Sequence, residues 1–154
     1  MSIPMDSMYR EIIVDHYKHP EHRGLLDDFD AEIHHVNPTC GDEVTLRIRV
    51  ADGTVKDVGW VGEGCSISQA STSVMSDLVV GRPVEQALAM QEKFLRLMQS
   101  QGKGELAELS DKEADELGDA VAFEGVSKYP ARVKCALLGW MAMKGAVAAT
   151  QEGK

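Results

Sequence analysis

Hydrophobic and polar residues alternate most clearly between positions 44 and 51. The apolar members of this pattern are Val44, Leu46, Ile48 and Val50. A period of two is typical of a strand with one buried face. Asp52-Gly53 is a hairpin turn pair, so residues 55–61 are expected to return as the partner strand. Residues 31–36 predict a third, shorter strand.

The hydrophobic period changes to three and four residues after position 65. Apolar residues at this helical spacing are Ile67, Ala70, Val74 and Leu78. Ser66 and Gln69 form a capping-box pattern at the start of the predicted helix, and Gly81 with Pro83 marks its end. Further helices are expected over residues 7–17, over 84–99, shortly after Ser110, and from Pro130 to Thr150.

The order of these elements predicts an α+β fold. The strands come early in the chain and most helices follow them, which favours a small three-stranded antiparallel sheet with helices packed mainly on one face. The chain has 154 residues, a length that most simply forms one domain spanning residues 1–154. The final predicted helix is apolar on most sides, so we expect it to pack through the middle of the domain.

Composition and charge narrow the functional classes. The net charge of −9 disfavours nucleic acid as a partner, because phosphate binding requires a basic surface. No apolar run is long enough to span a membrane, and the N-terminus lacks a signal-peptide pattern. An odd count of three cysteines argues against a secreted disulfide framework. Together these features predict a cytoplasmic protein.

The acidic residues are concentrated in a segment around 101–125, which we interpret as a helical insertion. Eight carboxylates there face only two lysines, Lys103 and Lys112. A solvated helical surface is the simplest interpretation. A docking surface for a basic patch on a partner protein is the alternative.

The strongest chemical signal comes from the three cysteines, Cys40, Cys65 and Cys135, together with Asp42. Thiolates and a carboxylate suit tetrahedral Zn²⁺ or an iron site. Cys40 and Cys65 lie in glycine-containing loops at the two ends of the predicted hairpin, where functional groups are often presented. Because Cys40 and Asp42 would diverge on an extended loop, chelation by both requires a turn at Gly41. Cys135, on an apolar helix, is equally well explained as a core residue.

The histidines and tryptophans are weaker signals. All five histidines lie in the first quarter of the chain: His16, His19, His22, His34 and His35. A His/Cys metal site is possible, but scattered surface histidines are the better explanation. Trp60 and Trp140 are expected in the core.

Several ordered motifs resemble the family of IscU and NifU N-terminal domains. They are residues 37–42 (Asn-Pro-Thr-Cys-Gly-Asp), residues 64–71 beginning Gly-Cys-Ser, residues 132–135 (Arg-Val-Lys-Cys) and the N-terminal stretch 9–20. The resemblance covers essentially the whole chain. It implies a compact α+β domain whose three cysteines and Asp42 meet at one exposed end.

Two departures from the scaffold members indicate the SufU branch of this family. Lys134 stands where scaffold members carry a histidine before the third cysteine, and residues 127–132 lack the Leu-Pro-Pro-Val-Lys-like stretch. The acidic segment before Cys135 also resembles the insertion that marks the SufU branch.

The resemblance implies a zinc-dependent sulfurtransferase of iron–sulfur cluster assembly. Its Zn²⁺ ligands would be Cys40, Asp42, Cys65 and Cys135. Its partners would be a SufS-type cysteine desulfurase, whose persulfide sulfur passes to Cys40, and downstream iron–sulfur scaffold proteins. Arg132, near the site, would assist catalysis by steadying the departing thiolate or Asp42.

Two other functions use the same ligands. One is an IscU-type scaffold that assembles a transient [2Fe–2S] cluster, which three thiolates and a carboxylate can hold. The other is a structural zinc domain that acts as an interaction module.

Overall fold

The computed structural model describes residues 7–38, 41–99 and 111–152 of the chain. The elements are α1 (Ser7–Lys18), β1 (Ala31–Asn37), β2 (Asp42–Ala51), β3 (Thr54–Glu63), α2 (Ser66–Val79), α3 (Val84–Gln99), α4 (Asp111–Leu117), the 3₁₀ helix η2 (Gly118–Lys128) and α5 (Pro130–Glu152). The three strands form one antiparallel sheet in the order β1-β2-β3. This arrangement confirms the predicted α+β class.

The sheet follows the alternation of the sequence. Val44, Leu46 and Ile48 of β2 are buried, whereas the residues between them are partly exposed. Asp52 and Gly53, at the turn to β3, both have positive φ angles, 54° and 72°. Two left-handed residues suit a tight hairpin turn whose twist matches that of the strands. The hairpin therefore forms as predicted and leaves the first residue of β2 at the same end as the last residue of β3.

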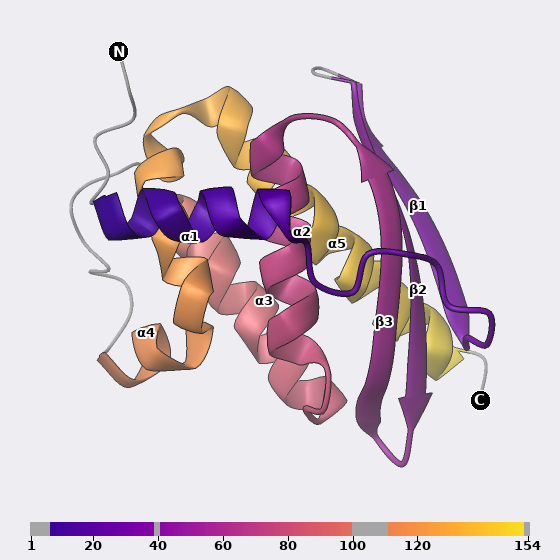
Figure 1. The fold of residues 1–154 in the computed structure, drawn as a ribbon. Helices are drawn as coiled ribbons and strands as arrows, with labels where there is room; N and C mark the ends of the chain where they lie inside the picture. The colour runs from indigo at the N-terminus through magenta and orange to yellow at the C-terminus, as the bar shows by residue number, and fades with distance from the viewer. Residues whose placement is uncertain (1–6, 39–40, 100–110, 153–154) are drawn as a thin grey trace.

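The helices cover one face of the sheet (Figure 1). α5 packs against β1, β2 and α2, and so lies in the middle of the domain as predicted. α2 and α5 approach closely at Gly139. A Cβ atom at this position would lie only 2.3 Å from Thr72 Oγ1, so the absence of a side chain allows the contact. Trp140 of α5 is fully buried, and its ring stacks on Phe94 with a centroid separation of 4.6 Å. Trp60 is also buried, so both tryptophans belong to the core as expected.

The connector between α1 and β1 runs along the outer edge of β3, where Arg23 and Trp60 form an isolated parallel bridge (Figure 1). The Gly24 amide donates a 2.6 Å hydrogen bond to the Trp60 carbonyl. The Trp60 indole donates to the Glu21 carbonyl at 2.9 Å. A Cβ atom at Gly59 would lie 2.4 Å from the Gly24 carbonyl oxygen, so a glycine is required for this close approach.

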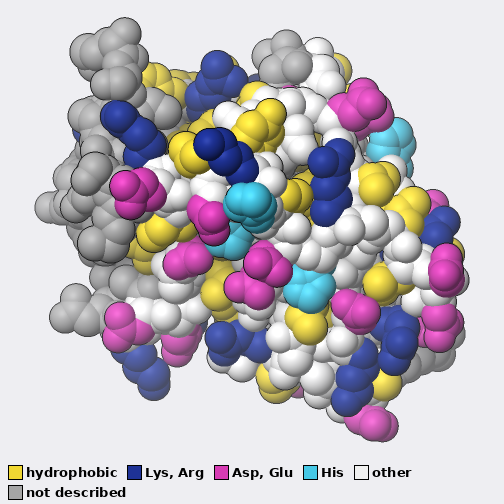
Figure 2. All heavy atoms as spheres, viewed as in Figure 1, with side chains coloured by type: hydrophobic (Ala, Val, Ile, Leu, Met, Phe, Trp, Pro, Cys, Tyr) yellow, Lys and Arg dark blue, Asp and Glu magenta, His cyan; other side chains and the backbone are white. Residues whose placement is uncertain are grey.

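The described part of the acidic segment packs into the fold. α4 and η2 bury Leu117, Ala120 and Phe123 completely. Glu116 accepts a hydrogen bond from Lys93, and Glu113 pairs with Arg96 at 2.7 Å. The segment is thus more than a solvated surface, because α3 partly neutralises its charge. Figure 2 shows acidic and basic side chains interspersed on the viewed face. Residues 101–110 lie outside the described residues, and the insertion as a domain feature stays a prediction.

His16 contradicts the interpretation of the histidines as surface residues. It is 7% exposed, near the C-terminal end of α1. Its Nδ1 lies 2.8 Å from Ser73 Oγ, and its Nε2 lies 3.1 Å from Asp119 Oδ2. Three helical elements meet at this imidazole, so burial comes from tertiary packing rather than from any local pattern. Among the described helices, none is both long and apolar enough to cross a membrane.

Candidate metal centre

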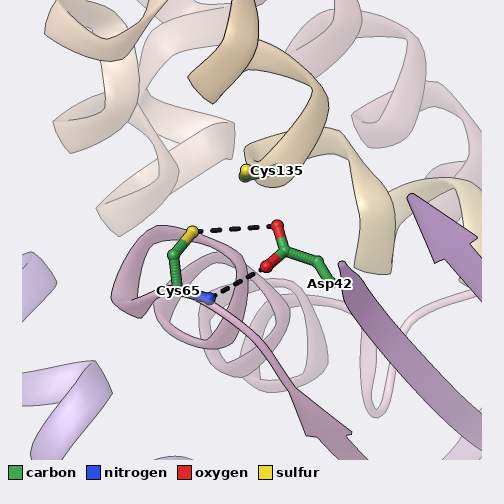
Figure 3. Close-up of side chains that lie close together, drawn as sticks. All are labelled: Asp42, Cys65 and Cys135. Atoms are coloured by element: carbon green, nitrogen blue, oxygen red, sulfur yellow. Dashed lines mark hydrogen bonds between the residues drawn. The ribbon is translucent and has the colours of Figure 1, made fainter. Parts of the chain in front are cut away.

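Three side chains from distant parts of the chain converge at one end of the sheet (Figure 3). Asp42 is the first residue of β2, Cys65 precedes α2, and Cys135 lies in the second turn of α5. One ligand atom from each residue lies within 4.8 Å of the other two. The predicted convergence of these three residues is therefore present. Cys40, the fourth predicted ligand, lies outside the described residues.

The local fold at Cys65 differs from the predicted capping box. Cys65, not Ser66, is the N-cap of α2, with φ −72° and ψ 164°, and its side chain makes no cap hydrogen bond. The side-chain NH₂ group of Gln69 donates a hydrogen bond to the Gly64 carbonyl at 3.1 Å, so this side chain does not form the expected capping-box bond with the backbone N–H of the N-cap residue. The pattern thus marks the correct helix but is displaced by one residue. As a result the Cys65 thiol is not used as a helix cap.

Asp42 supplies the acceptor that the Cys65 backbone requires. Its Oδ1 accepts a 2.9 Å hydrogen bond from the Cys65 amide. Its Oδ2 lies 3.8 Å from Cys65 Sγ, at the distance of a weak hydrogen bond from the thiol. Asp42 is only 1% exposed, so this arrangement fixes a buried carboxylate beside a thiol. One carboxylate oxygen anchors the residue while the other faces the sulfur atoms.

Gly64 makes room for this carboxylate. It adopts φ +146°, a backbone conformation that residues with side chains rarely adopt. A Cβ atom there would lie 2.2 Å from Asp42 Oδ1. The glycine therefore serves both the backbone turn after β3 and the close seating of Asp42.

Cys135 is held by the packing of α2 on α5. The Ser71 hydroxyl donates to the Ala136 carbonyl at 2.6 Å, and the Trp140 indole donates to Ser71 at 3.2 Å. Cys135 itself is 1% exposed, and its Sγ lies 3.5 Å from the Ala131 carbonyl oxygen. Burial fits both a core cysteine and a metal ligand. Its proximity to Asp42 and Cys65 favours a ligand over a simple core cysteine.

The backbone before β2 makes the turn that joint chelation requires. Gly41 has φ +71°, and its amide donates a 2.9 Å hydrogen bond to the Asn37 carbonyl. Gly41 therefore forms a turn immediately before Asp42. This turn satisfies the condition that the sequence places on ligation by Cys40 and Asp42, although Cys40 itself is not described.

The donor set fits a thiophilic metal ion. Two thiols and one carboxylate within 4.8 Å match the ligands and the tetrahedral preference of Zn²⁺, and a fourth ligand would complete the site. Oxygen-preferring ions such as Mg²⁺ are disfavoured, because two of the three donors are sulfur atoms. Among the described residues this group contains no histidine.

The remaining predicted site residue, Arg132, lies in the first turn of α5, before Cys135. It is exposed, and its backbone amide donates to the Tyr129 carbonyl at 2.8 Å. Lys134, next to Cys135, is also exposed. The role of Arg132 stays a prediction. The Gly64-Cys65 pair in the sequence indicates a tight turn, which the positive φ angle of Gly64 confirms, but it does not indicate the close approach of Gly64 to Asp42.

Known proteins share both the sequence and the fold. A zinc-dependent sulfurtransferase SufU from Bacillus subtilis is 42% identical over 152 residues, which cover 97% of this chain and 95% of that protein. An iron–sulfur cluster assembly scaffold protein IscU from Streptococcus pyogenes is 37% identical and covers 93% of this chain and 84% of its own length.

Two solved structures of related proteins have a similar fold. The crystal structure of a putative iron–sulfur cluster assembly scaffold protein for the SUF system from Fervidobacterium islandicum matches with a TM-score of 0.78 and 34% identity, over 89% of this chain and 94% of that one. A NifU-like protein (N-terminal) from Brucella abortus matches with a TM-score of 0.83 and 26% identity, over 99% of this chain and 100% of that one. The family of NifU-like N-terminal domains matches residues 8–148. The chain belongs to this family.

Proposed function

We propose that the protein is a zinc-dependent sulfurtransferase of iron–sulfur cluster assembly. The observation that carries the proposal is the convergence of Asp42, Cys65 and Cys135, whose ligand atoms lie within 4.8 Å of one another. Similarity to a protein named zinc-dependent sulfurtransferase SufU supports it over nearly the full length of both chains. The proposed partners are a SufS-type cysteine desulfurase as sulfur donor and an iron–sulfur scaffold protein as acceptor.

Four residues would hold the zinc ion: Cys40, Asp42, Cys65 and Cys135. When bound, Zn²⁺ keeps its cysteine ligands deprotonated at neutral pH and has no redox role. Cys65 and Cys135 are anchored by helices, and Asp42 is anchored by the Cys65 amide. Cys40 lies in sequence beside the Gly41 turn, so it is the ligand proposed to exchange.

Cys40 would accept the sulfur as a thiolate. Its sulfur atom attacks the outer sulfur of the donor's cysteine persulfide, and a new S–S bond forms on Cys40. The S–S bond of the donor breaks, and the donor cysteine leaves as a thiolate that takes up a proton. The exchange needs no external oxidant or reductant, because sulfur passes between two thiols at the same oxidation level. Arg132 would stabilise the negative charge of the departing thiolate.

Purified protein gives a direct test. It should contain about one zinc ion per chain. Incubation with a SufS-type desulfurase and cysteine should increase the protein mass by one sulfur atom, and mild reduction should reverse the change. Cys40→Ser should not take up the sulfur, while its melting profile stays cooperative. Persulfide formation on Cys40→Ser at the wild-type rate would overturn the assignment of the acceptor.

A scaffold function is the second candidate, because a relative named iron–sulfur cluster assembly scaffold protein IscU is 37% identical. In that function the same four residues would hold an iron–sulfur cluster as cargo. Anaerobic incubation with iron, desulfurase and cysteine separates the two. A coloured cluster that passes intact to an apoprotein would favour the scaffold. Sulfur uptake by the zinc-loaded protein, with no cluster formed, would favour sulfur transfer.

A further inference from the structure

An apolar groove of about 370 Å³ runs beside the candidate metal centre. One wall is the end of the edge strand β1, and the other is formed by side chains of α3 and α5. The lining residues are His35, Val36, Asn37, Pro38, Leu95, Lys134, Leu137, Leu138 and Met141. The groove thus lies between an edge strand and apolar side chains of two helices.

β1 is an edge strand of the sheet, and its last residues line this groove. The sheet order is β1-β2-β3, and within the described residues no strand or isolated bridge pairs with the outer edge of β1. Alternate residues of an edge strand direct backbone N–H and C=O groups away from the sheet. An extended peptide can pair with such an edge while its alternate side chains enter adjacent pockets.

Two exposed hydrophobic side chains stand at the groove. Val36 of β1 is 52% exposed, and Met141 of α5 is 38% exposed. Together with Leu95, Leu137 and Leu138 they give the groove an apolar lining. A surface of this kind beside a candidate site indicates contact with a partner. Methionine is well suited to such contacts, because its side chain adapts to different shapes.

The charge of the groove narrows the choice of occupant. Among the described residues that line the groove, Lys134 is exposed and is the one lysine or arginine, and none carries a carboxylate. A lone ammonium group at the rim of an apolar groove favours a peptide that carries a carboxylate next to its apolar residues.

The groove is continuous with the proposed centre of sulfur transfer. Lys134 directly precedes Cys135, which contributes to the metal-ligand group. At its other wall, Asn37 and Pro38 lead along the chain toward Cys40, and the Asn37 carbonyl accepts the hydrogen bond of the Gly41 turn. A segment bound here would therefore lie next to the centre.

We propose that this groove binds an extended segment of the persulfide donor. The segment pairs with the outer edge of β1, inserts apolar side chains toward Met141 and Leu138, and places a carboxylate near Lys134. The proposal rests on the sulfur-transfer function proposed above and identifies the surface that recruits the donor.

Binding of a SufS-type cysteine desulfurase to the full zinc-loaded chain tests the groove. Val36→Lys adds a charge at the strand edge, and Lys134→Glu reverses the charge at the rim. Each should weaken binding at least roughly tenfold in calorimetric titration, as expected for loss of a central contact. The matched control is Val61→Lys, an exposed valine on the opposite edge strand, which should bind as wild type. Lys134→Arg should also retain binding.

Hydrogen exchange supplies a second measurement. Amides of residues 34–36 should become protected in the complex, whereas those of residues 58–61 should not change. Unchanged affinity of Val36→Lys and Lys134→Glu, with no protection of β1, would overturn the groove proposal. The sulfur-transfer function is tested separately. If it is correct, Cys40→Ser should bind the desulfurase with normal affinity but accept no sulfur. If the wild-type chain binds the desulfurase but accepts no sulfur, the proposed function is rejected while the groove proposal stands.

Discussion

The Cys65 amide donates a 2.9 Å hydrogen bond to the Asp42 carboxylate, which joins the start of β2 to the start of α2. This bond fixes one candidate ligand through the backbone of another. It also satisfies a backbone N–H group at the first turn of a helix, where helices lack internal acceptors. The contribution of Asp42 to stability can therefore be separated from its proposed contribution to metal binding.

Asparagine and alanine at position 42 should separate these contributions. Asp42→Asn keeps an oxygen for the Cys65 amide but removes the negative charge, so zinc affinity should fall at least roughly tenfold, given that even outer-shell partners contribute about 10–100-fold. Asp42→Ala should lose as much affinity and also destabilise the zinc-free protein by about 1–3 kcal/mol, because the amide loses its acceptor. Chelator competition measures the affinity, and urea unfolding measures the stability. Equal stability of the two variants would contradict the anchoring role.

Gly64→Ala should disturb the same carboxylate from the other side. The new Cβ would lie 2.2 Å from Asp42 Oδ1, and φ +146° is unfavourable for alanine. We expect a loss of about 1–3 kcal/mol in stability from the backbone conformation, together with weaker zinc binding. Gly81→Ala is the control, because Gly81 also has a positive φ, but its added Cβ would have no atom within 4 Å among the described residues other than Gly81 and its two chain neighbours. That variant should lose stability and keep zinc affinity. If both variants bind zinc equally, Gly64 has no positioning role.

The sequence was sufficient to predict the elements that depend on local pattern. The alternation from Val44 to Val50 and the Asp52-Gly53 pair specify the hairpin, because period and turn chemistry act over few residues. The boundaries of α3 were also predicted, since a helical period is bounded there by Pro83 and a glycine-rich stretch.

Features that depend on contacts between distant residues could not be predicted from the residues alone. No spacing rule brings Cys65 and Cys135 to Asp42; only the family resemblance indicated their convergence. The displaced cap of α2 has the same origin, because Asp42 comes from another element to satisfy the Cys65 amide. His16 was missed because its burial depends on the packing of three elements.

The buried contacts of His16 should stabilise the junction of α1, α2 and η2. With its proton on Nε2, the imidazole donates to Asp119, while its Nδ1 accepts from the Ser73 hydroxyl, whose oxygen also accepts the Glu21 amide at 2.7 Å. Ser73→Ala removes this shared group and should cost about 1–3 kcal/mol in unfolding free energy. Asp119→Asn keeps an acceptor on a half-exposed side chain and should cost less than about 1 kcal/mol. Faster hydrogen exchange in α1 of Ser73→Ala would locate the effect, and an unchanged rate there would contradict it.

The Lys93–Glu116 pair should make stability depend on pH in the acid range. The hydrogen bond and charge of Lys93 lower the pKa of Glu116 below its ordinary value of 4.5, against an opposing effect of desolvation. A carboxyl whose pKa is lower in the folded state contributes stability above its unfolded pKa, and this contribution is lost as the pH falls through the folded value.

Glu116→Gln should therefore lower the melting temperature at pH 7, and the difference from wild type should shrink as the pH falls through about 4 and below. Lys93→Met provides the matched background, because it removes the ammonium group that lowers the pKa of Glu116. In that background, Glu116→Gln should have little effect on the melting temperature at any pH, since the pair acts as one unit. A wild-type advantage over Glu116→Gln that persists unchanged into the acid range would show that packing, rather than the ion pair, holds α4 against α3.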